Sequence, residues 1–351
     1  MAFYRALSCA MALVLWTCCA ASRASTPAGD PAGGSGYRLI RTVPLPGDGN
    51  WDHLTLDPDA RRLYVTHKDC VQVLDVDSLN LVGSVKGMRD CHVVVALDAL
   101  GKGYVSCSDP GSVVVFDLKS LARLAEIPSR KDTDALVYDA AGGKVIAFNG
   151  DGRSATVIDP ATDKVVDILN LGGAPETAVP DGQGRIFDNL KDKGEVIRIS
   201  SKTMKIDRRW PLAPGEFPAS MAMDVEHHRL FVGCRNKLLV VMDSTNGSII
   251  QTLPLGKHVD TTVFDPKTGT IFNSCGNGTL AVVHEDDPDS YSVEEYVETE
   301  NDAKTMAFDP MTGRVFLSTA RTQSVHLQGT AEPERKEVVA GTFHILVMAK
   351  Q

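Results

Sequence analysis

The sequence is short of positive charge. Thirty-six Lys and Arg stand against 45 Asp and Glu, a formal net charge of −9, whereas proteins that follow a phosphate backbone carry clustered positive charge. We therefore expect no nucleic-acid partner. Hydrophobic residues make up 43% of the chain and charged residues 23%, which is close to an ordinary globular protein and excludes disordered, collagen-like and coiled-coil chains.

Several motifs of well-known chemistry are also missing. The chain has no CxxC or CxxCH, which argues against thioredoxin chemistry and covalent haem, and no GxSxG nucleophile elbow. No GxGxxG precedes a helical pattern. After the first residues there is no apolar run of 18, so we expect no transmembrane segment in the mature chain.

The amino-terminal residues are typical of an export signal. Arg5 supplies the positive charge, Leu7 to Trp16 form an apolar run too short to cross a bilayer, and Ser22-Arg23-Ala24 offers a cleavage site. We predict a signal peptide at residues 1–24, a Gly- and Pro-rich linker at 25–36, and a periplasmic or secreted protein. Export would leave five cysteines, either unpaired or with one disulfide between Cys91 and Cys107.

A repeat runs along the remaining chain. An apolar strand pattern ending in Asp recurs every 41 to 44 residues, the period of a four-stranded propeller blade. The marker residues are Asp57, Asp98, Asp139, Asp181, Asp224, Asp265 and Asp309. No segment has a convincing helical period, so the prediction is an all-β, seven-bladed β-propeller in one domain, residues 37–351. Because Asp at a strand end typically bonds the following turn, we interpret these markers as turn residues.

The last repeat departs from this pattern. About 19 extra residues separate its second and third strands, so we expect a polar, mobile loop over the tunnel mouth at about residues 321–341. The chain then ends without an outer strand. Residues 39–45 resemble the outer strand at residues 249–255, and we predict that they pair into the last blade, because an open ring would leave unpaired sheet edges.

Two segments carry a resemblance to a known family. Tyr64-Val65-Thr66-His67 stands where the YVTN repeat has its name motif, with His67 in place of Asn, and Trp51 to Asp57 resembles the first blade of exported YncE-like proteins. This likeness, over residues 37–350, implies an exported seven-bladed propeller. It implies no particular activity, because one fold hosts many functions.

The candidate site follows from the repeat. Residues at the start of each innermost strand should ring the tunnel mouth, and counting five back from each marker, with a shift of one in the second and fifth repeats, gives mostly polar residues. With His53 added, the candidate ligand-binding residues are Asp52, His53, His92, Asp134, Glu176, Ser220, Asp260 and Lys304. Like charges at one place favour a bound cation, a basic ligand or raised pKa values. The alternative is that these residues only cap strand ends.

Five of these residues are candidate metal ligands. They are Asp52, His92, Asp134, Glu176 and Asp260. Oxygen ligands with an imidazole suit Ca²⁺, Mn²⁺ or Zn²⁺. Two functions fit: a monomeric binding or scaffold protein that holds a small molecule, metal or protein partner at the polar top face, or a metal-dependent, lactonase-like hydrolase or lyase in which His92 or His53 moves a proton.

Overall fold

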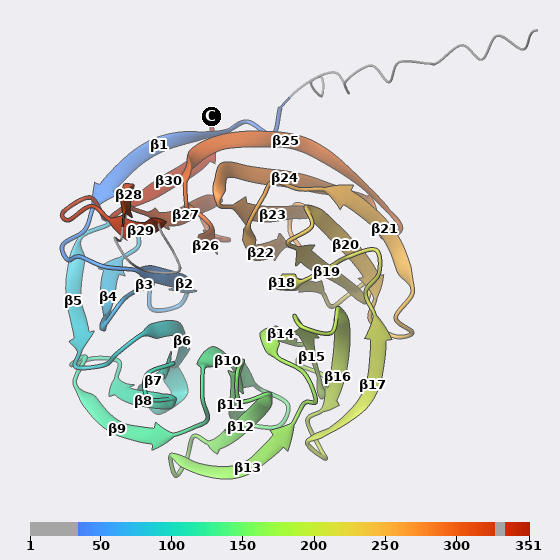
Figure 1. Ribbon diagram of the computed structural model, residues 1–351, viewed down its shortest axis with the longest axis horizontal. Coiled ribbons are helices and arrows are strands. Elements are labelled where there is room, and N and C mark those ends of the chain that lie inside the picture. The colour runs from blue at the N-terminus through green and yellow to red at the C-terminus, as the bar shows by residue number, and fades with distance from the viewer. Residues whose placement is uncertain (1–33, 327–333) are drawn as a thin grey trace, which may run out of the picture. The chain divides into compact units, whose positions relative to one another are not determined.

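The computed structural model describes residues 34–326 and 334–351, and within these ranges seven four-stranded antiparallel sheets form a ring (Figure 1). The all-β, seven-bladed propeller is therefore confirmed. The one helical element in the described ranges is the short 3₁₀ turn η1 (Asp98–Leu100). No described helix reaches the length and hydropathy needed to cross a membrane. The predicted signal peptide, 1–24, and most of the linker, 25–36, lie outside the described residues.

Blades one to three each consist of four consecutive strands, which run outward from the axis. Blade one contains β2 (Trp51–Asp57), β3 (Arg62–His67), β4 (Cys70–Asp75) and β5 (Leu81–Lys86). Blade two contains β6 (Cys91–Leu97), β7 (Lys102–Cys107), β8 (Ser112–Asp117) and β9 (Arg123–Pro128). Blade three contains β10 (Thr133–Asp139), β11 (Lys144–Asn149), β12 (Ser154–Asp159) and β13 (Lys164–Asn170).

Blades four to six repeat the same order. Blade four contains β14 (Pro175–Pro180), β15 (Arg185–Leu190), β16 (Glu195–Ser200) and β17 (Lys205–Pro211). Blade five contains β18 (Pro218–Asp224), β19 (Arg229–Cys234), β20 (Leu238–Asp243) and β21 (Ile249–Pro254). Blade six contains β22 (Val259–Asp265), β23 (Thr270–Cys275) and two long strands, β24 (Asn277–Asp287) and β25 (Ser290–Asn301).

Blade seven is assembled from both ends of the chain. Its order is β26 (Thr305–Asp309), β27 (Arg314–Thr319), β30 (His344–Lys350) and β1 (Tyr37–Pro44). β1 pairs antiparallel with β30 from Tyr37 opposite Lys350 to Pro44 opposite His344. The amino-terminal strand therefore supplies the outer strand that the carboxyl-terminal end lacks, which leaves no blade of the ring incomplete.

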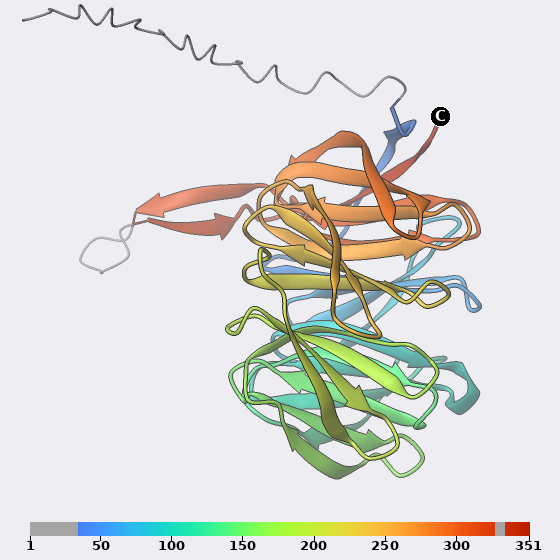
Figure 2. The ribbon, with the colours of Figure 1, turned by 90° about the vertical axis from the view of Figure 1, so that its right-hand side faces the viewer.

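The insertion in blade seven contains a hairpin where the sequence indicated a loop. β28 (Thr322–His326) pairs with β29 (Glu334–Val338) from Thr322 opposite Val338 to His326 opposite Glu334. These strands project away from the ring (Figure 2). Strand pairing satisfies the backbone N–H and C=O groups of this polar segment, although neither strand has a buried side-chain face. Because such strands lack the alternation of apolar and polar residues, the sequence pattern does not reveal them.

The marker aspartates act as turn residues. Asp57 Oδ1 accepts hydrogen bonds from the backbone N–H groups of Asp59 and Ala60, and five of the other six markers likewise accept a bond from a backbone N–H two or three residues further on. A carboxylate that binds the next turn fixes where the inner strand ends. The markers thereby set the register that places the opposite end of each inner strand at the tunnel mouth.

Aromatic side chains of the second strands help to fill the space between neighbouring blades. The third position of the second strand is aromatic in six of the seven blades and fully buried in each, at Tyr64, Tyr104, Phe187, Phe231, Phe272 and Phe316. Tyr64 of blade one packs against Phe116 of blade two with ring centroids 6.1 Å apart. Gly103 lies beside that ring, and an added Cβ there would approach it to 2.1 Å. Because apolar side chains fill the space between the blades, the polar side chains of the inner strands lie at the tunnel mouth.

Candidate functional site

β-Bulges shape the mouth of the tunnel. The pairing of the first and second strands shifts register near the amino-terminal end of the inner strand in blades one to six, for example between Trp51 and Leu54 in β2. A bulge turns consecutive side chains toward one side of the strand. Accordingly Asp52 and His53 both line the cavity, as do Glu176 and Thr177.

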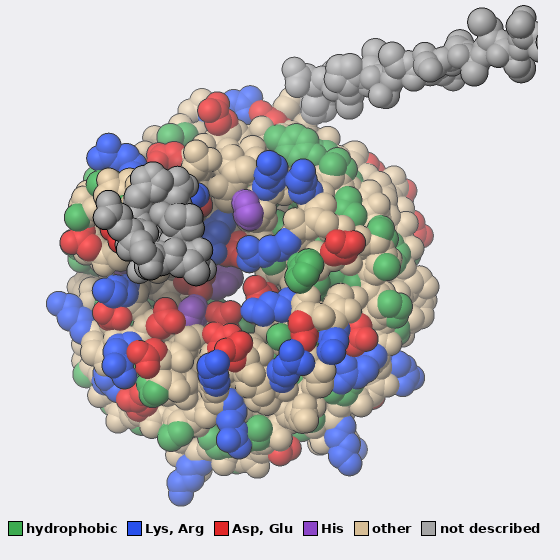
Figure 3. Space-filling model, viewed as in Figure 1, with side chains coloured by type: hydrophobic (Ala, Val, Ile, Leu, Met, Phe, Trp, Pro, Cys, Tyr) green, Lys and Arg blue, Asp and Glu red, His purple; other side chains and the backbone are tan. Residues whose placement is uncertain are grey.

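Seven of the eight predicted site residues line one axial cavity of about 160 Å³. They are Asp52, His53, His92, Asp134, Glu176, Asp260 and Lys304. Ser220 does not reach it: its side chain is buried, with Oγ 2.7 Å from Thr262 Oγ1, and Ala219 lines the cavity instead. The bulge between Pro218 and Ser220 reverses the shift that the sequence indicated for blade five. Charged side chains of both signs surround the opening (Figure 3).

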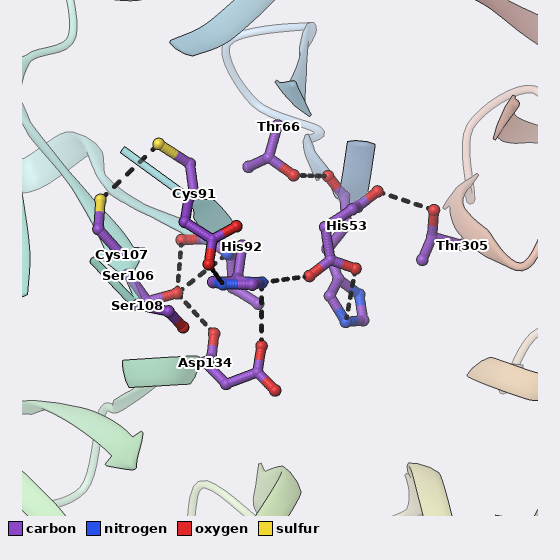
Figure 4. Close-up of polar contacts among 12 residues, drawn as sticks. His53, Thr66, Cys91, His92, Ser106, Cys107, Ser108, Asp134 and Thr305 are labelled. Carbon is purple, nitrogen blue, oxygen red and sulfur yellow. Dashed lines mark hydrogen bonds and ion pairs between the residues drawn. The ribbon is translucent and has the colours of Figure 1, made fainter. Parts of the chain in front are cut away.

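Three of the predicted metal ligands form a compact cluster. Ligand atoms of Asp52, His92 and Asp134 all lie within 4.8 Å of one another. His92 Nδ1 is 2.6 Å from Asp52 Oδ2 and 3.1 Å from Asp134 Oδ1. Figure 4 shows the His92 ring with its dashed contact to Asp134. One ring nitrogen therefore faces two carboxylates from adjacent blades.

The other two predicted ligands are paired with cations. Glu176 accepts a hydrogen bond from Lys191 Nζ. Asp260 lies between Arg235 Nη2 at 2.7 Å and Lys304 Nζ at 2.6 Å. Three basic side chains thus neutralise the blade four to seven side of the cavity, whereas the blade one to three side carries two carboxylates and the imidazoles of His53 and His92.

Sequence reasoning missed Lys191 and Arg235. Lys191 follows the last residue of β15, and Arg235 follows the last residue of β19, so both occupy the same position of the repeat. Because second strands run antiparallel to first strands, their carboxyl-terminal ends lie at the tunnel mouth. Counting to the last residue of each second strand gives Leu190 and Cys234, so both basic residues lie one position beyond it.

The electrostatics of the cluster follow from these contacts. Burial raises the pKa of Asp52, but His53 and the hydrogen bond from His92 outweigh it, so that pKa is lowered overall. Burial lowers the pKa of His92, yet Asp52 and Asp134 raise it to about 9. Burial, together with Asp52 and Glu176, raises the pKa of Asp134 to about 6 against the attraction of His92. At neutral pH the cluster holds one imidazolium between two carboxylates.

A larger cavity of about 370 Å³ shares three lining residues, Asp52, His92 and Lys304, with the axial one. Its other walls include Trp51 and three residues of the hairpin, Thr322, Lys336 and Val338. The insertion therefore lies on the face of the propeller that carries the acidic ring. A small molecule held there would contact the hairpin and the cluster together.

The cysteines of the described chain are all free thiols, at Cys70, Cys91, Cys107, Cys234 and Cys275. Cys91 and Cys107 are directly opposed across β6 and β7, with Sγ atoms 3.7 Å apart and both side chains buried. Four of the five thiols, all but Cys70, are buried, and Cys91 and Cys107 are the pair that the sequence also singled out.

One buried carboxylate near the cavity gives a stability prediction. Asp188 in β15 is fully buried, and its two side-chain oxygens have no hydrogen-bond partner among the residues that the structure describes. Burial, with the negative charge of Glu176 nearby, raises the pKa of Asp188 well above the usual range. The native state therefore retains a proton that the unfolded chain loses above about pH 3.9. We expect the stability gain of Asp188→Asn over the natural protein to grow between pH 4.5 and 7.5, by up to about 1.4 kcal/mol per pH unit.

Urea unfolding at the two pH values measures this effect. The exposed Asp59→Asn is the matched control and is expected to show a pH-independent difference within roughly ±0.5 kcal/mol. Parallel behaviour of the two variants would contradict the assignment of a protonated, unpartnered Asp188.

Comparisons with known proteins support the fold but identify no family. No protein-family model matches the chain, and no curated protein matches it. Among solved structures, the chain is similar to Kuenenia stuttgartiensis hydrazine synthase, with a TM-score of 0.69 and 14% sequence identity, over 79% of this chain and 94% of that one. Similarity at this identity supports the class of protein, a seven-bladed β-propeller.

Proposed function

We propose that this protein is an exported β-propeller binding protein of the YVTN-repeat, YncE-like kind, whose axial mouth holds a divalent metal ion on Asp52, His92 and Asp134. The observation that carries the proposal is the single imidazole nitrogen, His92 Nδ1, within 3.1 Å of carboxylates from two other blades. Export rests on the signal-like residues 1–24.

The distribution of charge supports a cation at this cluster. Glu176 and Asp260 already have basic partners, whereas Asp52 and Asp134 share one imidazole. A divalent ion in place of the Nδ1 proton would supply a second positive charge where two buried carboxylates meet, at the expense of one released proton. Asp90 Oδ2 lies 3.8 Å from His92 Nε2, where a carboxylate orients a metal-bound imidazole in many proteins.

The types of ligand atom in the cluster limit which metal ions it can bind. One imidazole nitrogen and two carboxylate oxygens suit Zn²⁺ or Mn²⁺ better than Ca²⁺, which takes oxygen ligands. In tetrahedral zinc sites adjacent ligand atoms are about 3.3 Å apart. The spacing between His92 and Asp134 is 3.1 Å, and that between His92 and Asp52 is 2.6 Å. Three protein ligands leave room for a water or a small ligand from the larger cavity.

Elemental analysis of natively purified protein tests the proposal. We expect one equivalent of zinc or manganese per chain at this cluster. After treatment with a chelator, the melting temperature is expected to rise on adding Zn²⁺, since a ligand at 100 times its Kd stabilises by about 2.7 kcal/mol. A protein purified without stoichiometric metal, whose melting is unchanged by Zn²⁺, Mn²⁺ and Ca²⁺, contradicts a metal site.

A second candidate, a metal-dependent hydrolase or lyase, is favoured by His53. This side chain lines the same cavity, is partly exposed, and its Nε2 lies 3.9 Å from Asp52 Oδ1, so it can exchange a proton with a bound substrate. Screening lactones and esters with the zinc-loaded protein separates the two functions. Catalysis predicts turnover that His53→Gln removes while metal binding persists, and binding alone predicts no turnover.

A further inference from the structure

A second group of metal-ligating side chains lies at the opposite end of the inner strand of blade five. Asp224 ends β18, five residues and roughly 16 Å beyond Ala219 at the tunnel mouth. Ligand atoms of Asp224, His227 and Glu285 all lie within 4.8 Å of one another. This group is separate from the axial cluster and shares no residue with it.

His227 enters the group because the turn of blade five differs from the others. Three residues after the marker aspartate, the other blades carry small or hydroxyl side chains: Ala60, Gly101, Gly142, Gly184, Thr268 and Thr312. Asp224 Oδ1 accepts the backbone N–H groups of Glu226 and His227, which leaves Oδ2 facing His227 Nδ1 at 2.5 Å. The turn itself therefore aims one carboxylate oxygen and one imidazole nitrogen at the same point.

Glu285 enters the group because blade six carries a carboxylate directly after the residue that ends the third strand in other blades. The backbone N–H of Glu285 donates to the carbonyl of Gly269, as the N–H groups of Val76, Leu118, Ser201 and Ser244 do to the corresponding carbonyl at the same position of their blades, and none of those four residues is acidic. The Glu285 side chain is only 7% exposed, and Oε1 lies 3.4 Å from His227 Nδ1 but has no hydrogen bond within the described residues. A buried carboxylate oxygen without a donor is costly, so the site lacks a partner for it.

Among the described residues, His227 is the basic side chain that approaches this oxygen within 4 Å. His227 Nδ1 can give its single proton to Asp224 or to Glu285, and the shorter distance is to Asp224. Arg229, which follows in β19, directs its guanidinium to the carbonyl of Pro288 and to Asp289. The adjoining cavity, of about 290 Å³, is lined by the further acidic residues Glu226, Asp286 and Asp287. The two buried carboxylates therefore share the single imidazole of His227, while Arg229 and His284 act on Glu285 without a hydrogen bond to it in the described chain.

The geometry points to a second divalent transition-metal site at the far end of the propeller, with Asp224 Oδ2, His227 Nδ1 and Glu285 Oε1 as its protein ligands. The spacing of 3.4 Å between His227 and Glu285 already matches the roughly 3.3 Å between ligands of tetrahedral zinc. The 2.5 Å spacing to Asp224 has to widen, and the half-exposed His227 side chain can rotate to allow it. The mixed nitrogen and oxygen set favours Zn²⁺ or Mn²⁺ over Ca²⁺.

Calorimetric titration of the chelator-treated protein with Zn²⁺ tests this site. To remove the axial cluster from the measurement, the titration uses Asp134→Asn as the background. We expect that protein to bind one equivalent of Zn²⁺ at this second site, and the addition of His227→Gln or Glu285→Gln to weaken binding at least tenfold. His228→Asn is the matched control, since His228 is adjacent in sequence and outside the group; binding is expected to be unchanged.

The outcomes of these titrations test the second site and the axial site separately. The inference is overturned if His227→Gln and Glu285→Gln bind Zn²⁺ as tightly as the background, or if His228→Asn loses as much affinity as they do. Thermal unfolding of each variant verifies that it is folded. Zinc binding that depends on His227 but not on Asp134 in the natural protein would support this second site and contradict the axial one, so the two proposals fail separately.

Discussion

Removal of residues 34–45, which contain β1, is expected to abolish folding of the propeller. The deletion removes the outer strand that pairs with β30, and with it the buried side chains of Tyr37, Val43 and Leu45. Burial of three such side chains contributes about 6 kcal/mol, comparable with the whole stability of a typical domain, about 5–15 kcal/mol. We therefore expect an aggregating protein without a cooperative melting transition by circular dichroism and size-exclusion chromatography.

The control for this deletion is a chain that begins at residue 34, which retains every contact of β1. It is expected to melt as the longer protein does. If the two truncations melt alike, β1 does not close the ring in solution, and blade seven is stable with three strands.

Asp134→Asn is expected to change stability in opposite directions with and without metal. In chelator-treated protein at pH 8 the variant should be more stable by roughly 1–3 kcal/mol, because the pKa of Asp134 is raised to about 6 from its ordinary value of 3.8. The carboxylate therefore destabilises the native state progressively as the pH rises from 4 through 6, and the advantage of the variant should vanish below pH 4. With saturating Zn²⁺, the natural protein should gain more stability than the variant, because it alone has the axial metal site.

Glu176→Gln is the matched comparison, since it removes a carboxylate of the same cavity that is paired with Lys191. We expect Zn²⁺ affinity to fall at least tenfold in Asp134→Asn and to change less than threefold in Glu176→Gln. Equal losses in the two variants would support the five-ligand ring inferred from sequence over the three-residue cluster. Affinity unchanged in both would contradict a metal at the mouth.

The fold was predictable because turn chemistry and period are local properties of the sequence. Aspartates such as Asp57 and Asp224 end their strands by bonding the next turn, so they recur with each blade and reveal the ring. The pairing of β1 with β30 followed from a missing outer strand. The hairpin β28–β29 was not predicted, because a polar strand pair without a buried face has little apolar alternation.

The site was predictable only as far as the repeat is regular. Asp52, Asp134 and Glu176 line the cavity at the step of five residues, and so does Ala219. Ser220, which the added shift of one selected, is buried, since β18 carries the same bulge as the other blades. A bulge depends on pairing with the next strand and cannot be counted along one strand. The pairing of Glu176 with Lys191 was missed for a related reason, because side chains from different strands meet only in the folded sheet.

The second cluster lay beyond sequence reasoning because it depends on two departures from the repeat. His227 replaces the small residue of a turn in blade five, and Glu285 of blade six stands where other blades have Val76, Leu118, Ser201 or Ser244. Neither departure indicates a site alone. Only the distance of 3.4 Å between His227 and Glu285 joins them.

Anomalous diffraction from crystals grown with Zn²⁺ tests the metal at the axial mouth most directly. We expect a zinc peak at the tunnel mouth, about 2.0–2.2 Å from Asp52 Oδ2, His92 Nδ1 and Asp134 Oδ1. This peak should be absent from crystals of Asp134→Asn. A map with no zinc peak among these three side chains, while Zn²⁺ is bound elsewhere on the same molecule, would contradict the axial metal site.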